Sequence, residues 1–243
     1  MNRDLQLALE LADISDAITL RSFRKSFQVR TKADRTPVSE VDEAVERAIR
    51  DRLERERPDD AIVGEELGKR GNSSRRWIID PIDATRNYIR GIPVFATLIA
   101  LDGEVGVVSA PALNRRWWAV RGEGAVCDDR PIRVSSIGRL EEAQLGYDSI
   151  VDFEMEERFL ALLRRCGRAR GFGDFWIHML VAEGAIEIAA EPKVAWWDMA
   201  AVQIIVEEAG GRFTTFDGQA RADGGSAISS NGLLHDEAMA ALR

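Results

Sequence analysis

The 243-residue sequence contains few of the residues on which disulfide-bonded, zinc-binding and membrane-spanning proteins depend. Its two cysteines, Cys127 and Cys166, belong to neither a CxxC pair nor a zinc-like cluster. Such low cysteine usage is typical of a reducing compartment, and we predict a cytoplasmic location. No run of about 18 apolar residues occurs, so we expect no membrane span and no membrane partner. The N-terminal stretch MNRDLQLALELAD carries acids within its apolar pattern, which indicates an amphipathic helix and not a secretory signal.

Positive charge is also scarce. The chain has 33 lysines and arginines against 41 acidic residues, a formal net charge of −8. This excess of acid argues against a nucleic-acid-binding face, and we expect no nucleic-acid partner. An acidic protein that handles an anionic phosphate needs a local source of positive charge, which a bound divalent metal supplies. Taken alone, the acidity is explained as readily by solubility.

Hydrophobic residues make up 45% of the chain, enough for a sizeable core. Apolar residues at helical spacing predict helices over 2–27, 39–55, 153–163, 174–184 and 197–209, and from residue 233. Short apolar runs between turn residues predict strands at 61–64, 77–79, 94–101, 104–110, 115–120 and 186–191. We therefore predict an α/β fold in which a mixed α+β half (1–140) and an α/β half (141–243) are tightly joined as one unit.

Four carboxylates stand out by their positions. Glu65 directly follows the first predicted strand, Asp80 follows the second, Asp83 lies three residues later, and Asp198 opens a predicted helix. Acids at the carboxyl ends of strands face the crevice where α/β sheets bind ligands. Several carboxylates in one crevice repel each other unless a cation neutralises them, and such hard oxygen ligands suit Mg²⁺. Each acid alone could equally be a helix cap or a turn residue, but together they favour a metal site.

The combination of GEE at 64–66, DPIDAT at 80–85 and WD at 197–198 resembles the inositol monophosphatase family, a group of lithium-sensitive, magnesium-dependent phosphatases. The resemblance covers nearly the whole chain and includes PVSEVDEAVE and VEEAGGRFTTFDG. It implies an αβαβα layered sandwich, hydrolysis of a small phosphate ester, two or three Mg²⁺ ions per active site, inhibition by lithium, and a homodimer.

The resemblance also implies roles for individual residues. Glu65, Asp80 and the backbone carbonyl of Ile82 match the ligands of a first metal ion, and Asp80, Asp83 and Asp198 match those of a second. Together, such ions generate a nucleophile from water at neutral pH and offset the charge of the phosphate and the leaving alkoxide.

Three further positions match the catalytic and phosphate-binding residues of the family. Thr85 matches the residue that hydrogen-bonds the attacking water, and Asp42 matches the acid that holds this threonine. The N–H groups around Ala84 and Thr85 match the phosphate cradle. Ser39 and Asp42 also form a plain capping-box pattern, and we expect both roles together only if the Asp42 side chain points away from the helix end. Ala84 stands where the family usually has glycine, and we expect it to be tolerated if its φ is negative and its methyl points away from the phosphate.

The substrate is indicated by two further acids. Asp174, in GFGDFW, resembles the histidinol-phosphate phosphatase branch of the family, whose substrate carries an ammonium group, and Glu191 matches a substrate-contact position. A pair of carboxylates suits a cation better than a neutral polyol, although Asp174 could also be a helix N-cap. Arg170 and Arg86 either approach the phosphate or are solvated surface residues. The stretches VGVVSAPALNRRWWAVRGEGA and GGSAISSNGLLHDE also resemble bacterial histidinol-phosphatases of this fold. On this resemblance we favour L-histidinol phosphate, hydrolysed in a late step of histidine synthesis, as the substrate.

Other interpretations remain open from the sequence. The same site could act on inositol-1-phosphate or a nucleotide 3′-phosphate. A non-catalytic partner-binding protein with this fold would show no phosphate release, and a purely structural cation site would leave Thr85 and the helix after it unexplained. His178 and His235 are expected to be structural.

Overall fold

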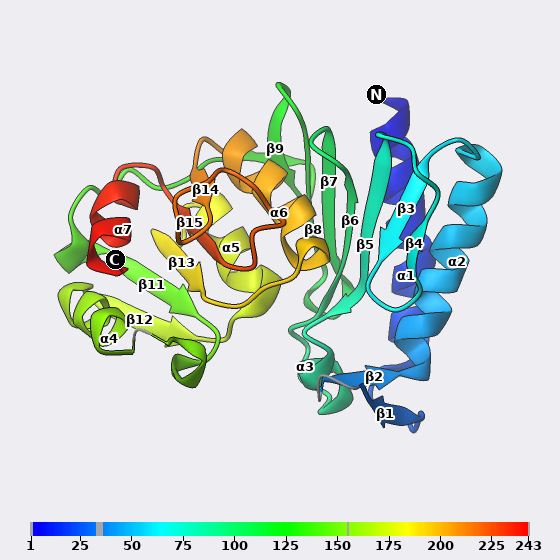
Figure 1. Cartoon of the computed structure of the whole chain (residues 1–243), viewed down its shortest axis with the longest axis horizontal. Helices are drawn as coiled ribbons and strands as arrows, with labels where there is room; N and C mark the ends of the chain where they lie inside the picture. The colour runs from blue at the N-terminus through cyan, green and yellow to red at the C-terminus, as the bar shows by residue number, and fades with distance from the viewer. Residues whose placement is uncertain (1, 33–35, 155, 243) are drawn as a thin grey trace.

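The N-terminal helices form the first layer of the computed structural model, which describes residues 2–32, 36–154 and 156–242 (Figure 1). α1 (Arg3–Ser22) begins at Asn2, whose side chain accepts hydrogen bonds from the Asp4 and Leu5 N–H groups, and α2 (Glu40–Glu56) begins at the Ser39 cap. Their apolar faces pack on one face of a large sheet. The predicted extension of α1 to residue 27 is wrong, because Phe23 and Phe27 leave the helix to pack against the ring of Tyr88.

The second layer is an eight-stranded sheet of strand order β10-β9-β8-β7-β6-β5-β3-β4. Its strands are β3 (Ala61–Gly64), β4 (Gly68–Arg70), β5 (Arg76–Asp83), β6 (Ala96–Leu101), β7 (Val105–Ala110), β8 (Arg115–Val120), β9 (Gly124–Cys127) and β10 (Arg130–Ile132). Only β3 and β5 run parallel; the other neighbours are antiparallel. A separate hairpin pairs β1 (Val29–Thr31) with β2 (Pro37–Ser39). The prediction that the second strand ends before Asp80 is wrong, because β5 continues to Asp83.

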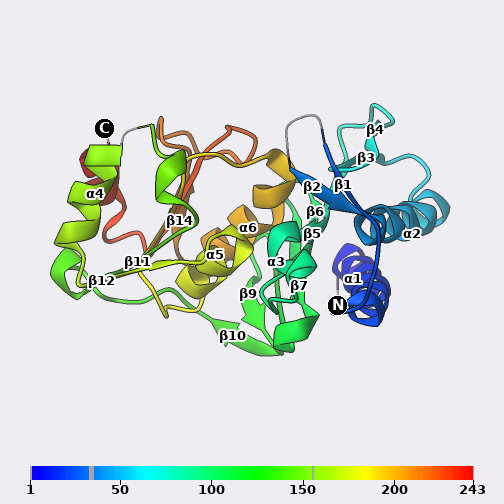
Figure 2. The same ribbon diagram turned by 90° about the horizontal axis from the view of Figure 1, so that it is seen from below.

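The third layer consists of α5 (Asp174–Ala182) and α6 (Trp196–Glu208), which lie between the two sheets (Figures 1 and 2). α6 is apolar around most of its circumference because it contacts strands of both sheets. Gly106 lets β7 approach α6 closely, since a Cβ there would lie 2.6 Å from the Ala201 carbonyl oxygen. This packing fixes the first turn of α6 relative to the large sheet.

The fourth layer is a five-stranded sheet of order β12-β11-β13-β15-β14. Its strands are β11 (Gln144–Tyr147), β12 (Arg168–Gly171), β13 (Ile188–Glu191), β14 (Arg212–Thr214) and β15 (Ala227–Ser230). α4 (Glu156–Arg165) and α7 (His235–Leu242) cover its outer face as the fifth layer. The predicted α/β class and αβαβα sandwich are thus confirmed.

The remaining elements are short. They are α3 (Thr85–Ile89) and the 3₁₀ turns η1 (Pro111–Leu113), η2 (Leu140–Glu142) and η3 (Ile150–Asp152). The predicted helix over 153–163 is wrong at its start, because η3 precedes it and Phe153 stacks on Phe159 of α4; residue 155 lies outside the described residues. Strands β3 to β10 form the large sheet and strands β11 to β15 form the small one. Because α6 packs on both sheets, the division at 140/141 stays a prediction.

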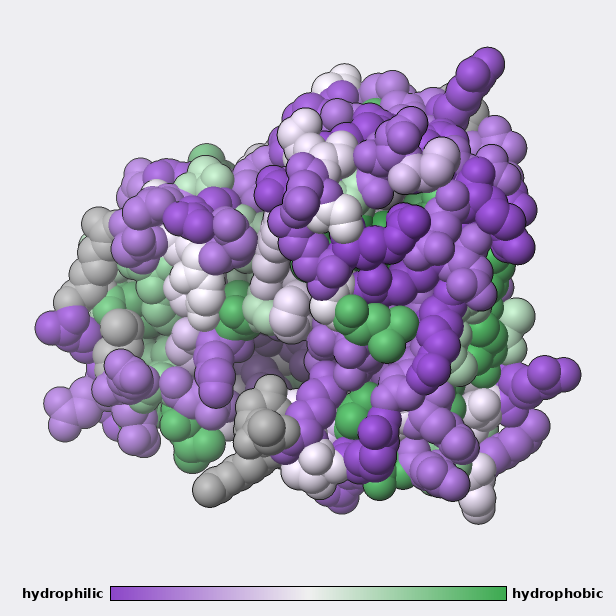
Figure 3. Space-filling view, turned by 45° about the vertical axis from the view of Figure 1, so that its right-hand side comes forward, coloured by the Kyte–Doolittle hydropathy of each residue, from purple (hydrophilic) through white to green (hydrophobic). Residues whose placement is uncertain are grey.

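The face of the molecule drawn in Figure 3 is largely hydrophilic, with apolar patches separated by polar residues. Among the described helices, none is both long enough and apolar enough to cross a bilayer.

Candidate active site

Asp80 and Asp83 reach one site because β5 is irregular between them. Residues three apart on a regular strand point to opposite faces of the sheet. The pairing of β5 with β6 shifts register between Asp80 and Asp83, around Pro81, and the Pro81 carbonyl accepts a hydrogen bond from the Thr97 hydroxyl (2.7 Å). This bulge turns both carboxylates toward the same space.

Glu65 lies beside Asp80 because β3 and β5 are parallel neighbours. Gly64 pairs with Ile79, so the next residue of each strand is an acid, and both acids stand at the same edge of the sheet. The Glu65 N–H donates to the Ile79 carbonyl (3.2 Å). In this structure the Glu65 side chain accepts a hydrogen bond from Lys32 (Nζ to Oε1, 2.7 Å), and Lys32 also contacts Glu66 (2.6 Å).

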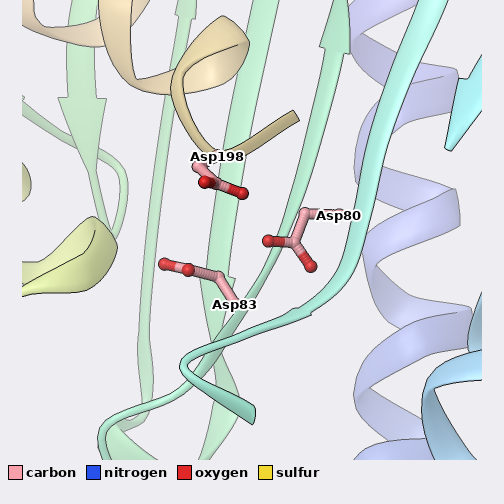
Figure 4. Close-up of side chains that lie close together, drawn as sticks. All are labelled: Asp80, Asp83 and Asp198. Carbon is pink, nitrogen blue, oxygen red and sulfur yellow. The ribbon is translucent and has the colours of Figure 1, made fainter. Parts of the chain in front are cut away.

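Asp198 comes from the opposite side, at the third residue of α6. One of its oxygens accepts a hydrogen bond from the Ala195 N–H (2.7 Å). Asp80, Asp83 and Asp198 each place a carboxylate oxygen within 4.8 Å of the other two (Figure 4). The N-cap of α6 is Ala195, so the interpretation of Asp198 as an N-cap is wrong, although its carboxylate caps the helix from inside the first turn.

These carboxylates are costly to ionise together. Burial, and then the nearby charges of Glu65 and Asp83, raise the pKa of Asp80 well above its usual value. Burial also raises the pKa of Asp83 and of Asp198, and the neighbouring charge of Asp174 adds to the shift at Asp83. Such shifts mark a site whose acids need a cation in order to be charged at neutral pH.

The donor set fits a hard divalent cation. Asp80 Oδ1 is buried and has no hydrogen-bond partner among the described residues, which is costly in the absence of a ligand. Asp83 and Asp198 each use one oxygen on a backbone N–H group, from Phe175 and Ala195 (both 2.7 Å). Both carboxylates nevertheless offer an oxygen within 4.8 Å of a carboxylate oxygen of Asp80. Carboxylate oxygens are the ligands that Mg²⁺ prefers in proteins.

Thr85 stands at the start of α3, between Asp42 and the end of β5. Its hydroxyl lies 2.9 Å from the Ile82 carbonyl oxygen and 3.4 Å from Asp42 Oδ1. The other Asp42 oxygen, Oδ2, accepts the Ser39 N–H (2.8 Å) in a capping box. The expectation that Asp42 can fill both roles only if its side chain points away from the helix end is therefore wrong. One carboxylate oxygen caps α2, while the other faces the Thr85 hydroxyl.

Ala84 adopts a conformation that usually belongs to glycine. Its φ of 63° and ψ of 43° are left-handed, so the negative φ on which the expected tolerance of Ala84 depends is not present. The Cβ makes this conformation unfavourable for an L-residue. The strain lies directly between the carboxylates of β5 and Thr85.

A second group of acids borders the carboxylate cluster. Asp174 begins α5 after an N-cap at Gly173, so the N-cap interpretation of Asp174 is wrong. Its N–H donates to Glu191 Oε1 (2.7 Å), and the other Glu191 oxygen lies 3.3 Å from the buried His178 ring. Burial and then the charges of Glu191 and Asp148 raise the pKa of Asp174 well above its usual value.

Two adjoining cavities connect these groups. A cleft of about 250 Å³ is lined by Glu65, Asp80, Ile82, Asp83, Ala84, Thr85, Arg86, Asp148, Phe172, Asp174 and Asp198, among others. A smaller cavity of about 70 Å³ adds Glu191 and Lys193. Arg170 is outside the lining of both: it is exposed on β12, and its guanidinium donates to the Ala169 carbonyl. Arg86 lines the larger cleft and is exposed.

Asp148, which lines both cavities, and Lys32, which contacts Glu65, were not predicted from the sequence. Asp148 follows β11 just as Glu65 follows β3, so an acid after a strand was the available signal. That strand, QLGY, has too little apolar pattern to be recognised. Lys32 carried no signal, because its contact with Glu65 depends on how the β1–β2 hairpin folds.

Comparison with known protein families shows to which family this chain belongs. A model of the inositol monophosphatase family matches residues 2–243. The chain belongs to this family. Histidinol-phosphatase of Mycobacterium tuberculosis is 51% identical over 253 residues, covering 98% of this chain and 97% of that protein. Histidinol-phosphatase of Streptomyces coelicolor is 49% identical, covering 96% and 94%. A solved IMPase of Thermotoga maritima has a TM-score of 0.91 at 34% identity, covering 99% and 97%.

These relationships confirm the predicted family, with its bacterial histidinol-phosphatase branch, and the predicted enzyme class. The chain is a phosphoric monoester hydrolase, and the alternative interpretation, a non-catalytic partner-binding protein, is not supported.

Proposed function

We propose that this enzyme hydrolyses L-histidinol phosphate to L-histidinol and phosphate, in histidine synthesis, with Mg²⁺ as its cofactor. The observation that carries the proposal is the adjacency of two acidic groups: the cluster of Asp80, Asp83 and Asp198, and the pocket of Asp174 and Glu191 beside it. The first group suits a metal and the second suits a cationic leaving group. The similarity to two proteins named histidinol-phosphatase supports the same substrate.

Asp80, Asp83 and Asp198, together with Glu65 and the Ile82 carbonyl, are the groups that would hold two or three Mg²⁺ ions. When bound, the ions supply positive charge that acidifies water and offsets the charge of the phosphate. Asp80 is near enough to Glu65, Asp83 and Asp198 for the charge of each to raise its pKa, which favours it as a shared ligand. For Glu65 to take part, its contact with Lys32 must open.

Thr85 and Asp42 form the proposed water-orienting pair. The Thr85 hydroxyl has one proton, which can point either to the Ile82 carbonyl (2.9 Å) or to Asp42 Oδ1 (3.4 Å). We propose that it points to Asp42 when the Ile82 carbonyl holds the metal ion, which leaves the hydroxyl lone pairs to accept a hydrogen bond from water. Burial raises the pKa of Asp42 to about 6, so this carboxylate is mostly ionised at neutral pH and able to accept. The pair orients the water, and no covalent enzyme intermediate is required.

The leaving-group side of the cleft favours an amine. Asp174, Glu191 and Asp148 gather negative charge there, and burial followed by the charges of Glu191 and Asp148 raises the pKa of Asp174. An ammonium group offsets this negative charge, whereas a neutral polyol such as inositol phosphate does not. Inositol-1-phosphate remains the alternative substrate because the fold matches a solved IMPase closely.

Asp174→Asn tests the proposed recognition of the amine. Asparagine tolerates the left-handed φ of 53° at this position, so the substitution removes charge without disturbing the backbone. We expect kcat/KM for histidinol phosphate to fall about 10- to 100-fold, the cost of losing a hydrogen bond to a charged group. Inositol-1-phosphate should change much less. Thr85→Ala is the matched control, because it should slow both substrates by similar factors; an equal effect of Asp174→Asn on both would contradict the assignment.

Three properties remain predictions from the sequence: a homodimer, inhibition by lithium and a cytoplasmic location. Arg170 as a phosphate contact also remains a prediction, one to which its exposed position lends no support.

A further inference from the structure

α2 carries a second buried carboxylate one turn beyond Asp42. Glu46 has 0% of its surface exposed, and its side chain points to the turn that follows β3. Glu46 Oε2 accepts the Glu66 N–H at 2.7 Å, and Oε1 accepts the Leu67 N–H at 3.1 Å. The carboxylate thus binds the backbone on the C-terminal side of Glu65.

Arg50, one further turn along α2, completes this contact. Its Nε–H donates to Glu46 Oε1 at 2.7 Å, and its Nη2 donates to the carbonyl of Gly68. The Glu65 N–H is held separately by the Ile79 carbonyl of β5. Three consecutive N–H groups, from Glu65 to Leu67, therefore have partners on two different elements. A turn fixed in this way has little freedom to move its side chains relative to β5.

The Glu46 carboxylate also explains why residue 64 is a glycine. A Cβ on this residue would lie 2.0 Å from Glu46 Oε1 and 2.4 Å from Cδ. Its φ is not in the left-handed region, so glycine is needed here for space and not for backbone conformation. The residue directly before Glu65 is therefore in contact with the carboxylate that binds the residues directly after it.

We propose that Glu46 is a positioning residue for the metal site: it holds the Glu65–Leu67 turn so that the Glu65 carboxylate faces Asp80. This inference rests on the proposed Mg²⁺-dependent function. One face of α2 then serves the site twice, with Asp42 directed at Thr85 and Glu46 directed at the Glu65 turn. Side chains that orient metal ligands typically change metal affinity 10- to 100-fold when they are replaced.

The test is the Mg²⁺ affinity of Glu46→Gln, measured by titration calorimetry on the full chain without substrate. An amide has only one acceptor oxygen, so its NH₂ group must face one of the three donors that Glu46 now accepts. We expect the Mg²⁺ Kd to rise about tenfold or more. At saturating Mg²⁺, kcat should recover most of its wild-type value, because Glu46 lines neither of the two cavities of the site.

Glu187→Gln is the matched control. Glu187 is also buried, 2% exposed, and accepts a backbone N–H, from Gln144 at 2.6 Å, but it lies at the start of the small sheet's strands. The Glu187→Gln variant should have a lower thermal stability than the wild type but the same affinity for Mg²⁺. If both variants bind Mg²⁺ equally weakly, or if Glu46→Gln binds it as tightly as wild type, Glu46 is only structural and the inference is overturned.

Gly64→Ala decides the question if Glu46→Gln does not fold. The added Cβ displaces the Glu46 carboxylate without removing it, and Mg²⁺ binding should weaken in the same direction. Unchanged Mg²⁺ affinity in Gly64→Ala would overturn the inference. Failure of the wild-type chain to bind Mg²⁺ would instead overturn the proposed function itself, so the two failures are distinguishable.

Discussion

At the scale of single residues, Asp42 shows how one carboxylate can combine a helix cap with a proposed catalytic contact. Oδ2 caps α2 through Ser39, while Oδ1 faces the hydroxyl of Thr85 at 3.4 Å. Because the two tasks use different oxygens, the capping pattern in the sequence did not argue against the catalytic role. The structure thus gives a physical basis for treating Asp42 and Thr85 as one functional unit.

Asp42 and Thr85 should therefore behave non-additively. We expect Thr85→Ala to lower kcat about 100-fold or more, the usual contribution of a group that assists proton transfer or orients water. Asp42→Asn should have a comparable effect alone and should add less than about tenfold in the Thr85→Ala background. Steady-state kinetics of the four proteins measure this, and fully multiplicative losses would show that the two residues act independently.

At the scale of secondary-structure elements, the periodic parts of the fold were predictable and the irregular ones were not. The apolar runs of β3, β6 and β7 locate those strands closely, because the core dictates their composition. β4 has only exposed residues and no apolar pattern, so nothing in its sequence indicates a strand. The bulge in β5 depends on its pairing with β6, which no local pattern encodes.

The same contrast holds for the active site. Glu65, Asp80, Asp83 and Asp198 stand out by position and family resemblance, and the three aspartates do lie together. Nothing in the local sequence distinguishes Glu46 from the other charged residues of α2. Its proposed role depends on a hydrogen bond to the backbone of Glu66, 20 residues further along the chain. The conformation of Ala84 could not be inferred either, because φ at this turn is set by the bulge before it and by α3 after it.

The turn between β5 and α3 should become more stable with glycine in place of Ala84. The left-handed φ of 63° costs an L-residue about 1–2 kcal/mol, and glycine avoids this cost. Part of the gain is offset because glycine has a higher conformational entropy in the unfolded chain. We expect Ala84→Gly to raise the free energy of unfolding by about 0.5–1 kcal/mol in urea titrations. A loss of stability would mean that the turn relaxes to another conformation, and a large gain in kcat would show that the methyl group obstructs the phosphate.

At the scale of the whole molecule, the buried acids should make stability depend on both pH and Mg²⁺. Burial raises the pKa of Asp42 to about 6 and of Glu66 to about 7, and that of Asp80 is raised as well. A carboxyl whose pKa is higher in the folded state binds more protons there, so its contribution to stability is lost as pH rises through the folded value. These groups therefore destabilise the metal-free protein progressively from about pH 4 to pH 7 and above.

Thermal melts in EDTA and in Mg²⁺ test this linkage. In EDTA, Tm should fall more steeply between pH 5 and pH 8 for wild type than for Asp80→Asn, which lacks one of the repelling charges. Mg²⁺ should raise the wild-type Tm at pH 8 and much less at pH 5, where protonated carboxyls cannot bind it. Equal pH slopes for the two proteins, or equal Mg²⁺ effects at both pH values, would contradict the electrostatic description of the site.

The whole molecule places the carboxylates of Asp80 and Asp83, at the end of one sheet, against an acidic pocket between the two sheets. The central proposal concerns the substrate that would span them. The most direct test is kcat/KM of the wild-type chain for L-histidinol phosphate and for inositol-1-phosphate, with Mg²⁺ and with EDTA. We predict a preference for histidinol phosphate of at least about tenfold, with activity that requires Mg²⁺. A wide preference for inositol phosphate, or turnover unchanged in EDTA, would contradict the account.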